Sequence, residues 1–172
     1  MKEKINAVIK TDRLTLRPFE EGDLERTLAI LTDTEVKKTY MLPDFASTEQ
    51  AERLFRRFIE LSGDPARFVY AVSNEEGIVG FLNDVERTET TVEMGYVIAT
   101  PYWGRGYATE AFLAVIRELF AAGFTTVRAG AFSENIPSMR VMEKCGMCRT
   151  GETEIIPYRG VDRLCIYYEI RA

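Results

Sequence analysis

The middle of the chain changes from strand-like to helix-like patterning, and this order limits the folds that are open to it. Three segments rich in β-branched and aromatic residues follow one another across short polar turns: RFVYAV, GIVGFLNDV and TTVEMGYVI. Such turns predict an antiparallel meander, because parallel neighbours need a long crossover. Helical spacing follows, with one apolar face formed by Ala108, Phe112, Val115, Ile116 and Leu119. The chain therefore combines an antiparallel sheet with a helix that leads away from it.

The flanking segments complete one mixed domain. Before the meander, RLTLRPF predicts a strand, and helical spacing predicts helices over 20–33 and 47–63. After it, the patterns predict a strand over 125–132, a helix over 135–146 and strands over 147–156 and 163–170. The expected fold class is α+β, with a βαβ unit in the second half. We expect a single domain over residues 1–172.

Two glycines mark the point where the last meander strand leads into the helix. Gly104 and Gly106 flank Arg105 in the sequence PYWGRGYATEAF. A glycine-rich entry to a helix suits a phosphate, because main-chain N–H groups are unpaired there and carry partial positive charge. Arg105 adds a full charge, and Thr109 offers a hydroxyl. A tight turn of purely structural use is the alternative reading.

Two common phosphate motifs do not fit this loop. The nucleoside-triphosphate loop needs Lys and then Ser or Thr after its second glycine, whereas Tyr107 and Ala108 follow here. The dinucleotide fingerprint needs a small residue at Thr109 and a carboxylate at the end of the next strand. That strand, over 125–132, ends without one. Nicotinamide binding is therefore disfavoured.

Composition excludes several other classes of function. A net charge of −5 disfavours a nucleic-acid binder, and the chain contains no apolar run long enough to cross a membrane. Three cysteines and no histidine predict neither a disulfide framework nor a zinc site, including at CGMC, so we expect a cytoplasmic protein without a metal. Without histidine, a general base must be a carboxylate, lysine, tyrosine, cysteine, terminus or relayed water.

Two longer stretches carry a family resemblance. In EMGYVIATPYWGRGYATEA (93–111) and NIPSMRVMEKCGM (135–147) the chain resembles the GNAT (GCN5-related N-acetyltransferase) superfamily, in particular its ribosomal-protein N-terminal acetyltransferase branch. The resemblance extends from TDRLTLRPF to LCIYYEI. It implies a central, mostly antiparallel twisted sheet of about seven strands with one splayed parallel pair, flanked by about four helices.

The resemblance also implies acetyl-CoA as cosubstrate and a division of labour along the chain. The family's pyrophosphate signature falls on Trp103, Gly104, Arg105, Gly106, Tyr107 and Ala108, where Trp103 departs from the usual Gln or Arg. Thr109 follows directly. The exposed main chain around Val97 and Ile98 would pair with the pantetheine arm, which Asn135 would also hold.

Catalytic residues are implied at two positions. Ser138 matches a residue near the sulfur and would protonate the departing thiolate. Glu93 lies where some family members keep a carboxylate base, and Asp84 and Glu154 are weaker candidates. Ribosomal-protein acetyltransferases carry a glutamate in the final hairpin, and the matching place here is near Pro157.

We therefore expect an N-acetyltransferase that moves acetyl from acetyl-CoA to a primary amine by direct transfer in a ternary complex. The amine would belong to a protein N-terminus or a small molecule, with no nucleic acid or membrane as partner. The alternative is a non-catalytic coenzyme A-binding module with a regulatory or scaffold use. The identity of the amine and the oligomeric state, with a homodimer as one option, stay open at this level.

Overall fold

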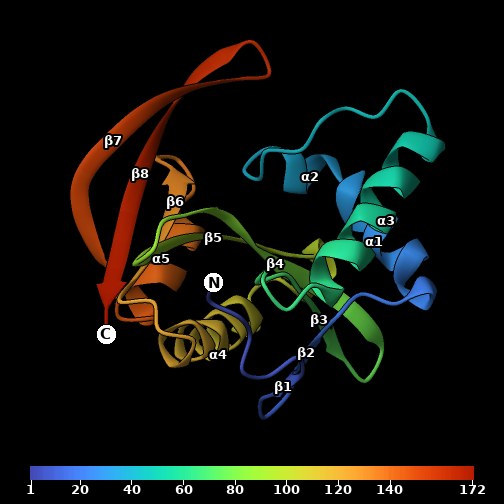
Figure 1. Ribbon diagram of the computed structural model, residues 1–172. Helices are drawn as coiled ribbons and strands as arrows, with labels where there is room; N and C mark the ends of the chain where they lie inside the picture. Colours follow the sequence, from blue (N-terminus) through green and yellow to red (C-terminus); the bar gives the residue numbers. More distant parts are fainter.

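A single twisted sheet forms the centre of the computed structural model, which describes residues 1–172 (Figure 1). Its strand order is β1-β2-β3-β4-β5-β6-β8-β7. The strands are β1 Ile9–Lys10, β2 Thr15–Arg17, β3 Tyr70–Asn74, β4 Gly77–Arg87, β5 Thr91–Ile98, β6 Thr126–Phe132, β7 Cys148–Tyr158 and β8 Val161–Arg171. All neighbours are antiparallel except β5 and β6. The predicted meander is confirmed as β3, β4 and β5.

The parallel pair is joined only at its beginning. Thr91, Val92 and Glu93 of β5 pair with residues 126–128 of β6, and no pairing continues beyond Glu93. Both strands run on, β5 to Ile98 and β6 to Phe132. The expected splayed pair is therefore confirmed, and the second half of β5 has an open side.

Helices cover both faces of the sheet. The α-helices are α1 Leu24–Leu31, α2 Thr34–Lys37, α3 Thr48–Gly63, α4 Tyr107–Ala121 and α5 Ile136–Lys144; two short 3-10 helices span Glu21–Asp23 and Thr100–Tyr102. The larger core lies between the sheet and α4 and α5, where Phe112 and Met142 are fully buried. The smaller core lies on the opposite face against α1 and α3, around Phe55 and Phe81. Alternating strand side chains supply both cores.

The counts of elements differ slightly from the expectation. The eighth strand is the two-residue β1, whose Ile9 pairs with Leu16 at the edge of the sheet. The fifth α-helix is the single-turn α2, which Asp33 caps by accepting a hydrogen bond from the Glu35 N–H. Neither element is long enough to show a period in the sequence. No helix combines the length and the apolar character that a membrane span requires.

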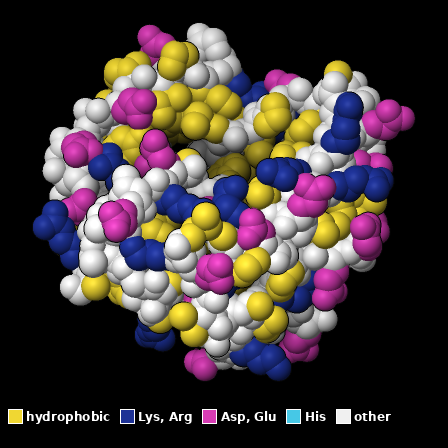
Figure 2. Space-filling view, in the orientation of Figure 1, with side chains coloured by type: hydrophobic (Ala, Val, Ile, Leu, Met, Phe, Trp, Pro, Cys, Tyr) yellow, Lys and Arg dark blue, Asp and Glu magenta, His cyan; other side chains and the backbone are white.

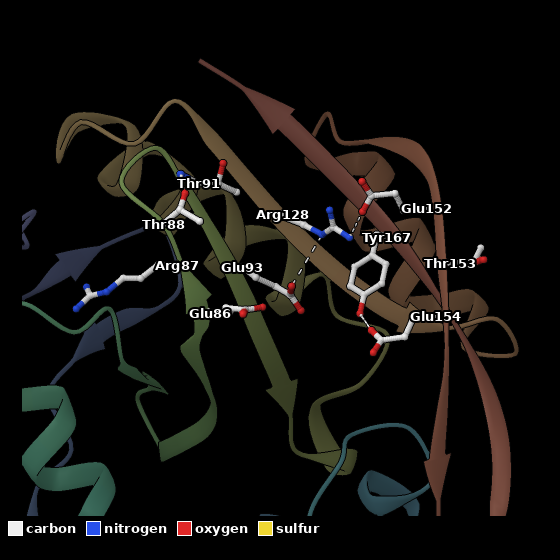
Figure 3. Close-up of a pocket in the computed structure, with 10 residues that line it drawn as sticks. All are labelled: Glu86, Arg87, Thr88, Thr91, Glu93, Arg128, Glu152, Thr153, Glu154 and Tyr167. Carbon is white, nitrogen blue, oxygen red and sulfur yellow. Dashed lines mark hydrogen bonds and ion pairs between the residues drawn. The ribbon is translucent and has the colours of Figure 1, made fainter.

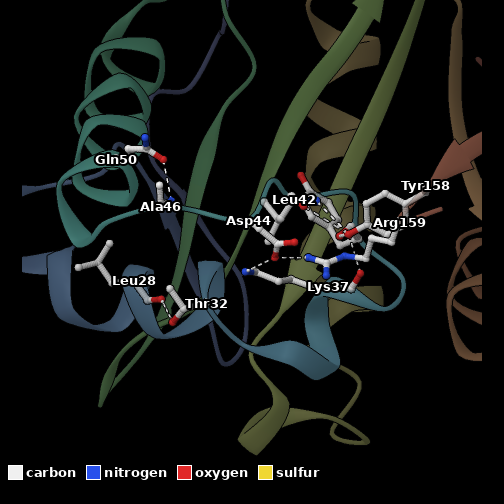
Figure 4. A network of polar contacts seen from close by, with 10 residues as sticks. Leu28, Thr32, Lys37, Leu42, Asp44, Ala46, Gln50, Tyr158 and Arg159 are labelled. Carbon is white, nitrogen blue, oxygen red and sulfur yellow. Dashed lines mark hydrogen bonds and ion pairs between the residues drawn. The ribbon is translucent and has the colours of Figure 1, made fainter.

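The β7–β8 hairpin bends over the sheet towards α2. At its tip, the Tyr158 hydroxyl donates a hydrogen bond of 2.6 Å to the Lys37 carbonyl oxygen. Arg159 is 2.7 Å from the Asp44 carboxylate, which also pairs with Lys37 at 3.3 Å (Figure 4). Figure 2 shows that the molecule is hollowed between this hairpin and the α2–α3 region, with hydrophobic side chains gathered around the hollow. We call the contacts of Tyr158 with Lys37 and of Asp44 with Arg159 and Lys37 the hairpin clasp.

Candidate active site

The glycine loop has a backbone that only glycine adopts easily. Gly104 and Gly106 have φ angles of +75° and +79°, in the left-handed region. Both are exposed, and no protein atom lies within 4 Å of the place that a side chain on Gly104 would occupy. The glycines therefore shape the turn, and they also leave its outer surface bare.

The loop presents a row of free main-chain donors. The first hydrogen bond at this end of α4 runs from the Glu110 N–H to the Gly106 carbonyl oxygen, at 3.1 Å. The N–H groups from Gly104 to Thr109, including those of Arg105, Tyr107 and Ala108, donate no hydrogen bond within the protein. Such donors at the positive end of a 15-residue helix are groups that can bind an anion.

Arg13 braces this loop from β2's side of the molecule. Its guanidinium donates to the Arg105 carbonyl oxygen at 2.8 Å and to the Glu110 carboxylate at 2.7 Å. It also lies 4.7 Å from the Tyr107 ring centre. Burial raises the pKa of Glu110, but hydrogen bonds from Thr11 and Arg13 outweigh it and lower the pKa overall. Sequence patterns could not indicate this role, because Arg13 and Glu110 are 97 residues apart.

The open side of β5 presents the main chain of Tyr96 and Ile98. Val97 pairs with Phe81, and a side chain at Gly80 would collide with the Val97 carbonyl oxygen, so that oxygen points towards β4. Main-chain groups alternate along a strand, so those of Tyr96 and Ile98 face the opening. The Trp103 indole N–H already donates to the Ile98 carbonyl oxygen, at 2.6 Å. Trp103, the departure from the family signature, thus fixes the loop to the end of β5.

Ser138 lies beside the same opening, at the start of α5. The Asn135 side chain caps this helix by accepting a hydrogen bond of 3.3 Å from the Ser138 N–H. The Ser138 hydroxyl is 2.6 Å from the hydroxyl of Tyr96 on β5. The structure therefore brings Asn135, Ser138 and the open half of β5 together. Sequence reasoning missed Tyr96, whose alternation with Val92 and Met94 indicated only a core position.

Glu93 lies at the last paired position before the strands splay. Its side chain alternates with that of Tyr96, so Glu93 and Ser138 approach the opening from opposite faces of the sheet. The carboxylate is 3.9 Å from Arg128, whose guanidinium also pairs with Glu152 and lies 4.1 Å from the Tyr167 ring centre (Figure 3). Burial raises the pKa of Glu93, and Arg128 partly opposes this.

A depression of about 500 Å³ surrounds this carboxylate. Its lining is mostly charged and polar and comes from β4, the β4–β5 turn, β5, β6, β7 and β8: Glu86, Arg87, Thr88, Thr91, Glu93, Arg128, Glu152, Thr153, Glu154 and Tyr167. Figure 3 shows Glu93, Arg128 and Tyr167 directed towards one another across it. A carboxylate of raised pKa in a hollow is the kind of group that serves as a general base.

The weaker base candidates are engaged elsewhere. Asp84 is buried and accepts hydrogen bonds of 2.9–3.1 Å from the Arg67 guanidinium, which makes it one half of a structural ion pair. Glu154 accepts a hydrogen bond of 2.6 Å from the Tyr167 hydroxyl. Pro157 lies in β7 opposite Asp162 and offers no proton acceptor on its side chain.

The cysteines form no disulfide. Cys145 and Cys165 are buried and Cys148 is exposed. Burial raises the pKa of Cys145 to about 12, so its thiol stays protonated near neutral pH. No cluster of three or more metal-ligating side chains occurs in the structure.

Comparison with known proteins identifies the family of this chain. The family model for the acetyltransferase (GNAT) domain matches residues 13–148. The chain belongs to the GNAT acetyltransferase family. The GNAT domain is 33% identical over 146 residues to YnaD, an uncharacterized N-acetyltransferase of Bacillus subtilis, with 83% of this chain and 84% of that protein covered. The expected family, enzyme class and acetyl-CoA cosubstrate are thereby confirmed.

Two solved structures share the fold of this GNAT domain. A GNAT-family acetyltransferase from Bacillus anthracis superposes with a TM-score of 0.82 at 29% identity, covering 95% of this chain and 98% of that one. RimL, a ribosomal α-N-protein acetyltransferase solved with coenzyme A, superposes with a TM-score of 0.83 at 15% identity, covering 95% and 97%. The expected mixed sheet with helices on both faces is thus a known GNAT architecture.

Proposed function

We propose that this GNAT domain transfers the acetyl group of acetyl-CoA directly to a primary amine of a small molecule or a protein N-terminus. The observation that carries the proposal is the row of free N–H groups from Gly104 to Thr109, set at the end of a strand whose other side is open. The free N–H groups suit a diphosphate, and the adjoining open strand edge suits an extended thioester arm.

The cofactor would run from the loop along β5. The diphosphate would accept hydrogen bonds from the loop N–H groups, with the charges of Arg105 and Arg13 nearby. The pantetheine arm would pair with the open main chain of Tyr96 and Ile98. Tyr96 takes the place of the expected Val97, whose main chain pairs with β4. Asn135 and Ser138 lie where such an arm would end, at the start of α5.

The acceptor amine would approach from the face that carries Glu93. A protonated amine gives up one proton before attack, and the carboxylate of Glu93 or a water that it holds would accept it. The amine nitrogen then forms a bond to the thioester carbon, and it loses its second proton to water as the amide forms. As the carbon–sulfur bond breaks, its electron pair moves to sulfur, which takes a proton from Ser138, and water restores that proton.

Positioning supplies most of the rate on such a site. Holding amine and thioester in line contributes up to about 7–11 kcal/mol in favourable cases. An acid or a base adds about 10²–10⁴-fold. The opposite placement of Glu93 and Ser138 across the sheet fits direct transfer, because base and leaving group lie on opposite sides of the reacting carbon.

The deciding experiment combines calorimetry with a thiol-release assay. Acetyl-CoA should bind, and amines from a panel of polyamines, amino acids, aminoglycosides and peptide N-termini should release free thiol. Saturable binding without release for any amine would favour a coenzyme A-binding module instead. No binding of acetyl-CoA at all would contradict the placement of the cofactor.

A further inference from the structure

Tyr96 links the open half of β5 to α5. Beyond Glu93, β5 has no main-chain partner on its β6 side. The Tyr96 side chain crosses to α5, where its hydroxyl lies 2.6 Å from the Ser138 hydroxyl and 3.0 Å from the Ser138 carbonyl oxygen. The two residues are 42 positions apart in the sequence.

Both partners are held firmly. The Tyr96 ring packs against Phe112 of α4, with ring centres 5.0 Å apart. Asn135 fixes the Ser138 main chain from the other side. The 2.6 Å contact is therefore set by the fold, because each residue is anchored independently of it.

The surroundings keep the Tyr96 hydroxyl neutral. Burial raises the pKa of Tyr96, and its hydrogen bond to Ser138 only partly opposes this. Cys145, the residue directly after α5, is the ionisable group that acts on Tyr96; it is itself buried, and its raised pKa keeps it uncharged near neutral pH. Tyr96 thus has one proton to donate and does not act as a base.

That single proton decides which way the Ser138 hydroxyl points. When Tyr96 donates to the Ser138 carbonyl oxygen, the Ser138 proton is directed back towards Tyr96. When Tyr96 donates to the Ser138 hydroxyl oxygen, the Ser138 proton is released to point elsewhere. Negative charge on a nearby sulfur favours the second arrangement, because it attracts the Ser138 proton.

We propose that Tyr96 is a positioning residue for acetyl transfer, which donates to the Ser138 hydroxyl oxygen and aims the Ser138 proton at the sulfur of the leaving group. This inference rests on the proposed function. In the step concerned, the carbon–sulfur bond breaks with its electron pair going to sulfur, and a proton moves from Ser138 to sulfur. A water molecule delivers a proton to the Ser138 oxygen as the Ser138 proton leaves, so no free alkoxide forms and Tyr96 keeps its own proton.

The first test is kinetic. Tyr96→Phe removes the hydroxyl and keeps the ring on Phe112, so kcat should fall about 10- to 100-fold, the range for a hydrogen bond to a charged group. The Kd for acetyl-CoA should stay unchanged. In a Ser138→Ala background the same change should have almost no further effect, because the partner is gone. Additive losses in the double variant would overturn the proposal.

A second test needs no acceptor amine. The thiol of bound coenzyme A can be titrated by the ultraviolet absorbance of its thiolate. Tyr96→Phe should raise the pKa of this bound thiol, because the Ser138 proton is no longer aimed at sulfur. Tyr70→Phe, on β3 and separated from β5 by β4, is the matched control and should leave it unchanged. An unaltered pKa in Tyr96→Phe at full coenzyme A occupancy would overturn the proposal.

The two tests distinguish a failure of the proposed function from a failure of the role proposed for Tyr96. If the wild-type protein binds coenzyme A but no amine releases thiol, the proposed function fails, and the thiol titration still decides the role of Tyr96. If the wild-type protein does not bind coenzyme A, both fail together. If thiol release is normal in Tyr96→Phe, only the inference about Tyr96 fails.

Discussion

The carboxylate of Glu110, in the first turn of α4, accepts hydrogen bonds from both the main-chain N–H and the guanidinium of Arg13. The same guanidinium holds the Arg105 carbonyl oxygen. This pair ties Arg105, within the glycine loop, to Glu110 in the first turn of α4, so the loop N–H groups are already oriented before a ligand arrives. Preorganisation of this kind increases affinity because less ordering remains to be done on binding.

Replacing Arg13 should therefore weaken coenzyme A binding. Arg13→Met keeps much of the side-chain volume and loses every polar contact of the side chain, and we expect the Kd for acetyl-CoA to rise about tenfold, as for a lost charged hydrogen bond. Arg13→Lys keeps the charge but cannot hold both Glu110 and Arg105. Calorimetry on both variants separates the effect of the positive charge from that of the hydrogen bonds to Glu110 and Arg105. A wild-type Kd in Arg13→Lys would mean that the charge alone matters and would contradict the bracing role.

A substitution at Gly104 tests whether the diphosphate of acetyl-CoA contacts the backbone of the glycine loop, and Gly151 provides a matched control. Gly104→Ala should lower the free energy of unfolding by about 1–2 kcal/mol, the cost of a left-handed residue with a side chain. Gly151→Ala should cost the same, because Gly151 has a φ of +84° and equally open surroundings on β7. Only Gly104→Ala should also weaken acetyl-CoA binding. Equal Kd values for the two variants would contradict the loop's role.

Glu93 should control the acid side of the pH–rate profile. Only the carboxylate form accepts a proton, and burial raises the pKa of Glu93, so kcat/KM should fall as the pH drops through this raised pKa. Glu93→Gln should lower kcat about 10²-fold and remove that limb, at unchanged acetyl-CoA affinity. Glu86→Gln, in the same depression, is the control. A limb that survives in Glu93→Gln would assign the base elsewhere.

Loss of the hairpin clasp should change the KM for the acceptor amine and leave the Kd for acetyl-CoA unchanged. Tyr158→Phe removes the hydrogen bond to Lys37 and should lower the free energy of unfolding by about 1 kcal/mol. Because the clasp joins the hairpin to the α2–α3 region across the hollow in Figure 2, and lies away from the glycine loop, the KM for the amine should change while the Kd for acetyl-CoA stays constant. Hydrogen exchange should be faster at residues 158–161. Protection equal to that of the wild type would show that the clasp does not hold the tip.

The local patterns along the chain were enough to predict the meander, the glycine loop and the helix after it. Each depends on neighbouring residues: alternation in a strand, or a left-handed turn that Gly104 and Gly106 alone adopt readily. The resemblance added the splayed pair and the places of Asn135 and Ser138. Short elements such as β1 and α2 escaped prediction because each spans only about one period, which is too short for a repeat to show.

Tertiary structure alone decided how these parts act together. The contact of Arg13 with Glu110 and that of Tyr96 with Ser138 join segments that become neighbours only once the sheet has its strand order. The direction of each main-chain group on β5, which favours Tyr96 over Val97, likewise depends on the register with β4. Sequence patterns determine which residues share a face of one element, whereas contacts between elements depend on packing that no single segment contains.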